Sequence, residues 1–376
     1  MVESLIELRD DISAAGGALN ILHGDDTTIE KIITENNITT VAFNRDYTPF
    51  AKARDSKIIT LCEKKGVKVI TSHDYLLLDE HSIDAKPYKI FTPFYNKYLK
   101  TEIREPSDKK VKISNIMIES VTQFDPSNLI GADRLIINPG RKAALGILKS
   151  IISGKFTNYE NDKDTLAVGN TNLSAHNKFG NISIREVYTT MKKGKCEGLI
   201  RQLFWRDFYY NLMNSDPYAL AGNYNSSYKQ KWANLNNPAI AKHFEAWKQG
   251  KTGFSVVDAG MRELSQTGMM HNRARLICAD FLVKLLRIDW RLGEKHFAQH
   301  LIDYDPTQNN YNWQWVAGTG PFSQPKYRVF NPYKQAADHD PKGEYVRKWV
   351  PEFASEEYPK PIVDYAEAKK EYLRSL

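Results

Sequence analysis

The sequence predicts a parallel α/β domain of the doubly wound type followed by a mainly α-helical domain. Helical and strand patterns alternate over residues 1–90, and almost every later pattern has a helical period. Residues 92–140 lose periodicity and contain four prolines. A chain of 376 residues with 41% hydrophobic content is long enough for two cores. We therefore place the domains at 1–91 and 141–376, with an interdomain linker at 92–140.

The first domain is expected to follow the order helix, strand, helix, strand, helix, strand. This order is typical of a parallel sheet with helical crossovers. Its first element is a helix, whereas doubly wound domains usually begin with a strand. The expected helices are 2–14, 27–36 and 51–65, and the expected strands are 18–22, 39–43 and 67–71.

The second domain is expected to be built from amphipathic helices, with few strand patterns. The charged C-terminal tail also favours a helix. The expected helices are 141–153, 183–193, 198–213, 238–249, 254–287 in at least two pieces, 293–302 and 364–373.

Composition limits the class of protein only loosely. The 52 basic and 45 acidic residues give a net charge of +7, which permits an anionic partner such as nucleic acid but does not require one. Cys62, Cys196 and Cys278 form no metal or redox motif and are expected to be free thiols. We expect no metal site, no membrane span, no signal peptide and a cytoplasmic, intracellular protein.

Residues 303–315 combine two acids, three asparagines, two tyrosines and two tryptophans. Asn and Asp favour turns, so we expect neither a helix nor a strand here. The two tryptophans would normally enter a core. The stretch is therefore interpreted either as the wall of a buried site or as a surface loop anchored by tryptophans.

Two helical stretches carry further candidate residues. In the first, Gln202, Trp205, Arg206 and Tyr209 fall on one helical face, which suits a flat polar ligand such as a nucleobase. The alternative is an ordinary packing seam.

In the second stretch, Asn272, Arg275 and Leu276 share a face and Arg273 points away. Asp303 and Asp305 are expected partners for these arginines, because a buried cation without a partner is costly. Such a pair beside Asn272 would suit a heteroaromatic cofactor or serve only as a structural ion pair.

Two weaker patterns remain. Asn170-Thr171-Asn172-Leu173-Ser174 precedes a helix-prone stretch, and could hold a phosphate or simply cap a helix. The same holds for Ser183. All seven tryptophans lie beyond residue 200, and they could relay electrons or simply fill a core.

Together these stretches resemble the photolyase/cryptochrome family, and specifically the class I cyclobutane pyrimidine dimer photolyases. The resemblance runs from about residue 1 to about residue 352. Its most specific segments are Trp205–Tyr209, Gly250–Gly253, Met270–Arg273, Ile288–Arg291, Asn312–Trp315 and Arg328–Pro332.

The resemblance implies a light-driven DNA repair enzyme, a deoxyribodipyrimidine photo-lyase. Members hold FAD in the helical domain, flip a pyrimidine dimer out of ultraviolet-damaged DNA and split it by electron transfer from the excited flavin. The implied cofactor-binding residues are Tyr159, Asn170, Thr171, Asn172, Leu173, Ser174, Arg206, Asn272, Arg275, Asp303, Tyr304 and Asp305. Arg275 and Asp303 are the expected ion pair.

Other residues are implied for electron transfer and for DNA. Asn309 matches the residue that faces flavin N5, and Trp313, Trp290 and Trp232 match the electron relay, from inner to outer. Residues implied for the dimer or for DNA are Lys163, Gln202, Trp205, Tyr209, Arg273, Leu276, Trp315, Arg328 and Gln335.

The chain departs from the family in several places. Gln202 stands where the family usually has Glu, and Leu276 where many members have Met. The family's opening strand, its helix and the next strand have no counterpart. The resemblance therefore implies either a truncated sheet or a sheet that a separate chain completes. An antenna chromophore, folate or deazaflavin, is doubtful.

These departures leave two alternatives to repair open. One is a cryptochrome-like flavin photoreceptor or a DNA-binding relative without repair activity. The other is a non-functional fragment.

Overall fold

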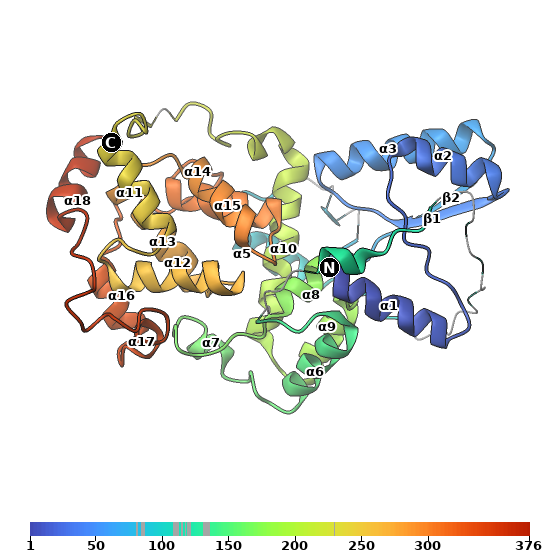
Figure 1. Ribbon diagram of the computed structural model, residues 1–376, viewed down its shortest axis with the longest axis horizontal. Helices are drawn as coiled ribbons and strands as arrows, with labels where there is room; N and C mark the ends of the chain where they lie inside the picture. The colour runs from blue at the N-terminus through green and yellow to red at the C-terminus, as the bar shows by residue number, and fades with distance from the viewer. Residues whose placement is uncertain are drawn as a thin grey trace. The chain divides into compact units, whose positions relative to one another are not determined.

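The computed structural model describes residues 1–79, 82–83, 87–107, 113, 116, 118, 122–130, 136–228 and 230–376. The chain folds into two compact units (Figure 1). The first unit comprises residues 1–87, 94–157 and 172–217, and the second comprises 88–93, 158–171 and 218–376. Part of the predicted linker, namely 108–112, 114–115, 117, 119–121 and 131–135, lies outside the described residues.

The first unit combines a small parallel sheet with helices. Its helices include α1 (Val2–Ala14), α2 (Asp26–Glu35), α3 (Pro49–Lys64), α6 (Gly140–Ile152), α8 (Leu173–Phe179), α9 (Ile184–Lys193) and α10 (Glu197–Ser215). Its strands are β1 (Thr40–Asn44) and β2 (Lys68–Ser72). The short helix η1 (Pro126–Leu129) also lies in this unit. Helix α5 (Phe91–Tyr98) begins in the second unit and enters the first unit at Phe94.

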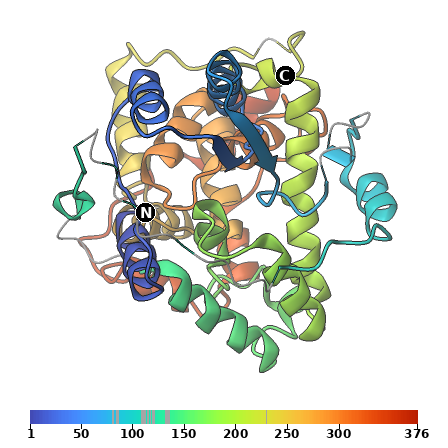
Figure 2. The same ribbon diagram turned by 90° about the vertical axis from the view of Figure 1, so that its right-hand side faces the viewer.

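The sheet consists of β1 and β2 paired in parallel, from Thr40 opposite Lys68 to Asn44 opposite Ser72. Helix α3 is the crossover between them, and α2 and α3 lie on the same side of the strands in both views (Figures 1 and 2). The expected strands at 39–43 and 67–71 are confirmed to within one residue at each end. The parallel α/β fold class is confirmed with them.

The expected strand at 18–22 is wrong. Only Leu22 forms a bridge, antiparallel to Gln123, and Ile21 O accepts from Phe124 N–H at 2.7 Å. The Asn20 side chain bonds Ile116 O and Ile118 N instead of extending a ladder. The apolar run is therefore only half-buried, because among the described residues it has no strand of the sheet beside it.

The second unit is almost entirely helical. Its elements are α7 (Tyr159–Asp162), α11 (Pro238–Lys248), α12 (Ser255–Thr267), α13 (Asn272–Asp280), the π-helix η3 (Phe281–Leu285), α14 (Trp290–His300), α15 (Pro306–Ala317), α16 (Pro332–His339), α17 (Glu344–Trp349) and α18 (Tyr365–Arg374). The predicted helices are present, and the 254–287 pattern divides into three pieces. In the part of the chain that is described, no helix has the length and apolarity to cross a membrane.

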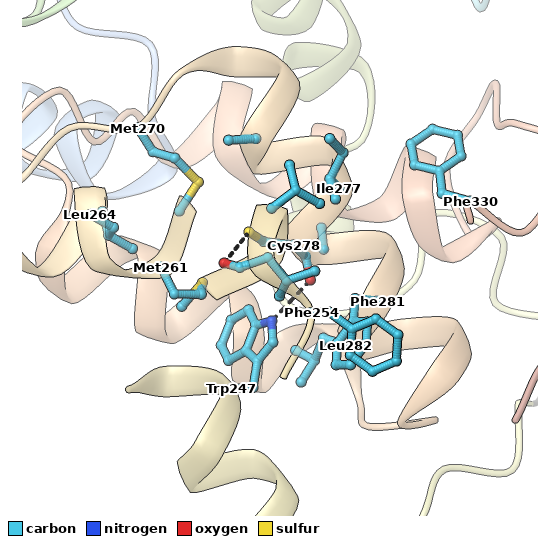
Figure 3. Close-up of a cluster of buried hydrophobic side chains, with 14 of the residues drawn as sticks. Trp247, Phe254, Met261, Leu264, Met270, Ile277, Cys278, Phe281, Leu282 and Phe330 are labelled. Atoms are coloured by element: carbon cyan, nitrogen blue, oxygen red, sulfur yellow. Dashed lines mark hydrogen bonds between the residues drawn. The ribbon is translucent and has the colours of Figure 1, made fainter. Parts of the chain in front are cut away.

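The core of the second unit surrounds α12 and α13 (Figure 3). Phe254 packs against Phe281 with ring centroids 4.9 Å apart. The Trp247 indole N–H donates to Cys278 O at 3.0 Å, and the Cys278 thiol donates to Val257 O at 3.4 Å (Figure 3). A fully buried indole therefore has its polar atom satisfied by the helix that it packs on.

The prediction that residues 303–315 would form neither helix nor strand is wrong, because α15 begins at Pro306. Asp305 caps the helix by accepting from Thr307 N–H and Gln308 N–H, both at 3.0 Å. Pro306 occupies the first turn, where a backbone N–H would have no partner in the helix, and proline has no such N–H. Gly318 ends the helix with a φ of 76°. Strong end signals outweigh the low helix propensity of the asparagines between them.

Replacing Asp305 tests this account of α15. Asp305→Ala should lower the free energy of unfolding by about 1–2 kcal/mol, because two helix-end amides lose their acceptor. Asp305→Asn keeps a side-chain acceptor and should lose less, and Asp364→Ala at the exposed cap of α18 is the surface control. Chemical denaturation measures the differences. Equal losses for the Ala and Asn variants would show that the charge, and not the cap, matters.

Candidate functional site

An ion pair joins α13 to the turn that precedes α15. Arg275 Nη2 lies 3.2 and 3.0 Å from the two carboxylate oxygens of Asp303, and Arg275 Nε donates to Met270 O at 2.9 Å. The Asp303 side chain is 5% exposed and that of Arg275 is 25% exposed. The structure therefore brings this predicted pair together and fixes the direction of the guanidinium.

The expectation that Asp305 would also pair with one of these arginines is wrong. One of its carboxylate oxygens caps α15, and the two arginines pair with other acids. Arg273 instead pairs with Asp164, at 2.7 Å from Nη2 and 3.2 Å from Nε. The two arginines thus point to different acids, in agreement with the expected divergence of their side chains.

Asn309 lies in the first turn of α15 and is held by Glu294 of α14. Its Nδ2 donates to Glu294 Oε1 at 3.0 Å, and the Tyr304 hydroxyl donates to the same oxygen at 3.3 Å. Burial raises the pKa of Glu294, while these two hydrogen bonds act in the opposite direction. The amide of Asn309 is therefore oriented by a neighbouring helix.

Trp313 lies one helical turn after Asn309 and is 2% exposed. Its ring lies against Gly293 of α14, where a Cβ atom would be 2.3 Å from Trp313 Cη2. Trp290 begins the same helix, is 1% exposed and donates from Nε1 to Asn223 Oδ1 at 3.0 Å. Trp232 is half-buried and packs against this core. The three predicted relay tryptophans thus lie in one unit, the inner two on adjacent helices.

Gly293 is predicted to be essential for the position of Trp313. Gly293→Ala should force the indole or α14 to move and cost about 1–3 kcal/mol of stability. Gly146→Ala on α6, where nothing lies within 4 Å, is the matched control and should stabilise slightly. Thermal unfolding and tryptophan fluorescence measure both variants. An unchanged Gly293→Ala protein would contradict the packing described.

Trp247 is a neighbour of the predicted relay, and sequence analysis did not assign it to that relay. Its ring centroid lies 6.3 Å from that of Trp313, edge to face, and Phe297 lies 5.0 Å from Trp313 on another side. These contacts enclose the Trp313 indole in aromatic rings. The spacing of the tryptophans alone could not reveal this, because Trp247 comes from α11, far from α15 in sequence.

The first unit carries the candidate residues of α10. Gln202 is exposed and bonds Gly198 O at 3.3 Å, while Trp205 is half-buried and packs on Phe208 and Tyr209. Arg206 is buried, donates to Tyr75 O and lies over the Tyr75 ring at 3.9 Å. The guanidinium is thus held within the first unit.

The candidate phosphate segment crosses from the second unit, which holds Asn170 and Thr171, into the first, which holds Asn172–Ser174. Asn172 precedes α8 with a φ of 56° and makes no side-chain cap. Ser183 does cap α9, in a box with Glu186, so its hydroxyl follows the capping alternative.

Near α7, burial raises the pKa of Tyr159 to about 12, and Lys163 pairs with Glu160.

Other residues of the second unit that were predicted to contact DNA include Leu276 and Trp315, which pack at the edge of the core. Arg328 is exposed and Gln335 is half-buried on α16. In the described residues, no three His, Cys, Asp or Glu side chains gather as a metal site would require.

His271, the N-cap of α13, should make stability depend on pH. It is 5% exposed, and burial lowers its pKa to about 4. The unfolded chain takes up a proton near pH 6.5 while the folded protein does not, so stability falls between about pH 6.5 and 4. His271→Asn keeps a cap acceptor and should remove at most about 3 kcal/mol of that loss. Unfolding curves across this range test it, with exposed His23→Asn as the control; an unchanged profile for His271→Asn would contradict the assignment.

Sequence reasoning missed three residues that position the candidates: Glu294, Asp164 and Gly293. Glu294 is separated from Asn309 by 15 positions and Asp164 from Arg273 by 109. No local spacing signals such contacts. Gly293 could have been noticed as a glycine inside a helical pattern, which often marks close packing.

Comparison with known proteins identifies the family of this chain. The family model described as the FAD binding domain of DNA photolyase matches residues 199–357, and the model described as DNA photolyase matches residues 1–111. The deoxyribodipyrimidine photo-lyase of Agrobacterium fabrum is 33% identical, covering 98% of this chain and 86% of that protein. That of Escherichia coli is 32% identical, covering 92% and 79%.

Solved structures give the same answer. An archaeal photolyase from Sulfolobus tokodaii, described with two FAD molecules, has a TM-score of 0.88 and 35% identity over 100% of this chain and 86% of its own. A bacterial class III photolyase from Agrobacterium tumefaciens has a TM-score of 0.85 and 31% identity, covering 99% and 86%. The Synechocystis cryptochrome has 0.83 and 25%, also covering 99% and 86%. The chain therefore belongs to the DNA photolyase family.

Proposed function

We infer that this protein is a light-driven DNA repair enzyme, a deoxyribodipyrimidine photo-lyase that uses FAD to split cyclobutane pyrimidine dimers. The observation that carries this inference is the arrangement of α15. Asn309 and Trp313 are one turn apart, so an oriented amide and a buried indole share one helical face. An amide suited to a flavin and a tryptophan suited to supply its electrons are thus combined on one rigid element.

The polar groups of this region fit a flavin. Arg275 and Asp303 present a guanidinium and a carboxylate in fixed directions, and Asn309 adds a carboxamide held by Glu294. These are donors and acceptors of the kind that a flavin ring and its ribityl chain require. We assign Asn272, Tyr304 and Asp305 to the same site, and Tyr159, Arg206 and residues 170–174 to the remaining contacts of the cofactor.

When bound, FAD would absorb light and supply the electron that splits the dimer. The chain itself would position the reactants and exclude water. Trp232, Trp290 and Trp313 would carry electrons inward. Asn309 would hydrogen-bond the flavin at N5, and Arg275 would offset negative charge on the bound flavin. Glu294 would keep the Asn309 amide oriented through its 3.0 Å bond.

The DNA side of the proposal uses residues from both units. In the second unit, Trp315 and Leu276 would give the flipped dimer aromatic and apolar contacts. In the first unit, Trp205, Gln202 and Tyr209 are proposed as further dimer-binding residues. Arg273, Arg328, Lys163 and Gln335 would contact the backbone, where cations neutralise phosphates. Gln202 is the observation that favours the alternative, a cryptochrome-like photoreceptor or DNA-binding relative without repair, because it lacks the charge that the family's Glu carries.

Repair under blue light is the direct test. Purified protein with reduced flavin should restore an ultraviolet-damaged oligonucleotide in the light and leave it unchanged in the dark. Liquid chromatography of the intact and repaired strands measures the product. Photoreduction of the flavin without any loss of dimers would favour the photoreceptor and contradict the enzyme.

The relay is tested separately with Trp313→Phe. This variant should lose photoreduction of its oxidised flavin, because the inner electron donor is gone, and should still repair after chemical reduction. The absorbance change under blue light with an external donor measures the first step. Trp349→Phe, at a tryptophan outside the proposed relay, is the control. Normal photoreduction in Trp313→Phe would contradict the relay assignment.

Three finer proposals accompany the function. We assign 1–91 to the α/β photolyase domain, 92–140 to the linker and 141–376 to the FAD-binding domain.

We propose that the enzyme is intracellular and associated with DNA. We also propose that a second chain can pair with the edges of β1 and β2, because in the described part of the chain the sheet has two strands and each strand therefore keeps one edge. A single-chain mass in sedimentation, with full repair activity, would contradict that partner.

A further inference from the structure

Asp280 and Lys284 form an ion pair that is closed to solvent. Their side chains are 1% and 0% exposed, and Lys284 Nζ lies 2.8 Å from Asp280 Oδ2. Asp280 ends α13 and Lys284 lies in the π-helix η3 that follows it. Burying two charges carries a large desolvation cost, which often cancels the attraction between them. Stability alone therefore does not explain this buried pair. The further bonds of the two side chains point to another role.

Both side chains also bind one irregular segment, residues 324–330. Lys284 Nζ donates to Arg328 O at 2.5 Å, and Asp280 Oδ1 accepts from Phe330 N–H at 2.8 Å. Gln324 Nε2 reaches Asp280 Oδ2 at 3.4 Å. The segment contains no helix or strand. The ion pair therefore fastens both of its ends to the core of the second unit.

Between these anchors the segment presents cationic and aromatic groups outward. Tyr327 is 72% exposed, and Arg328 is exposed beside it. Lys326 Nζ lies 3.2 Å from the centroid of the Tyr228 ring. The carbonyl of Arg328 thus faces the buried lysine while its side chain faces solvent. This geometry fixes the root of a cation and leaves its guanidinium accessible.

We propose that the Asp280–Lys284 pair is a positioning device for DNA binding, which holds residues 324–330 so that Arg328 meets a phosphate from a fixed backbone. The proposal rests on the proposed repair function, because that function supplies the DNA. A segment ordered before binding loses less conformational entropy when it meets the duplex. Neither Asp280 nor Lys284 touches the DNA itself.

The double variant Asp280→Leu/Lys284→Met is the sharpest probe. Apolar side chains of similar volume commonly replace a buried pair without loss of stability. They cannot bind Arg328 O or Phe330 N–H, so these backbone groups should turn to water and release the segment. Glu367→Gln/Lys370→Gln removes an exposed pair on α18 of the same unit and is the matched control.

Two measurements follow, both on the full chain with flavin bound. Hydrogen–deuterium exchange at residues 324–330 should become at least about tenfold faster in the double variant, while exchange in α12 and α14 is unchanged. Affinity for an ultraviolet-damaged duplex, measured by fluorescence anisotropy over a range of salt, should fall about tenfold. The salt dependence should decrease by about one phosphate contact.

A cycle with Arg328→Ala separates positioning from general damage. Arg328→Ala should weaken binding in the natural chain and add little in the double variant, because its contact is already lost there. Asp280→Asn keeps an acceptor for Phe330 N–H and should give a smaller loss. This variant decides the question if the double variant does not fold.

Natural affinity, natural salt dependence and natural exchange in a folded variant would overturn the positioning role. The two proposals fail differently. A natural chain that does not bind the damaged duplex refutes the repair function, whereas a natural chain that binds it no better than the double variant refutes only this inference.

Discussion

The need to satisfy buried polar groups on α15 is the constraint on which the site depends. Gln314 is 0% exposed, and its amide donates to Ala219 O at 2.9 Å and to Asn310 Oδ1 at 2.7 Å, while Tyr224 N–H donates to its carbonyl at 2.8 Å. A buried amide that lost these partners would be costly. The helix therefore has one position in the core, and that position sets the directions of Asn309 and Trp313.

Chemistry follows from this rigidity. Glu294 orients Asn309 from α14, and Gly293 of the same helix receives the Trp313 ring. Arg275 and Asp303 join α13 to the chain just before α15. Three neighbouring helices thus fix an amide, a cation and an indole with little freedom. Preorganised groups of this kind act on a bound cofactor without the cost of reorganisation.

Much of the fold and part of the site could be predicted from the sequence, for physical reasons. Apolar periodicity located α2, α9 and α14, because their amphipathic patterns are strong. It failed at 18–22, where the apolar run lies beside no strand of the sheet in the described structure, and at α15, where caps and tertiary bonds overcame asparagine-rich propensity. The Arg275–Asp303 pair could be predicted because a buried cation needs an acid as its partner. Glu294 and Asp164 lie too far in sequence from their partners Asn309 and Arg273 for any local signal.

We infer that α13, α14 and α15 build a flavin site for DNA repair. A crystal structure of the purified protein with its flavin and a dimer-containing oligonucleotide tests it most directly. We expect the flavin N5 edge at the Asn309 amide, the flavin ring beside Arg275 and Asp303, and the dimer in contact with Trp315. A flavin bound elsewhere, or a dimer bound away from it, would contradict the account.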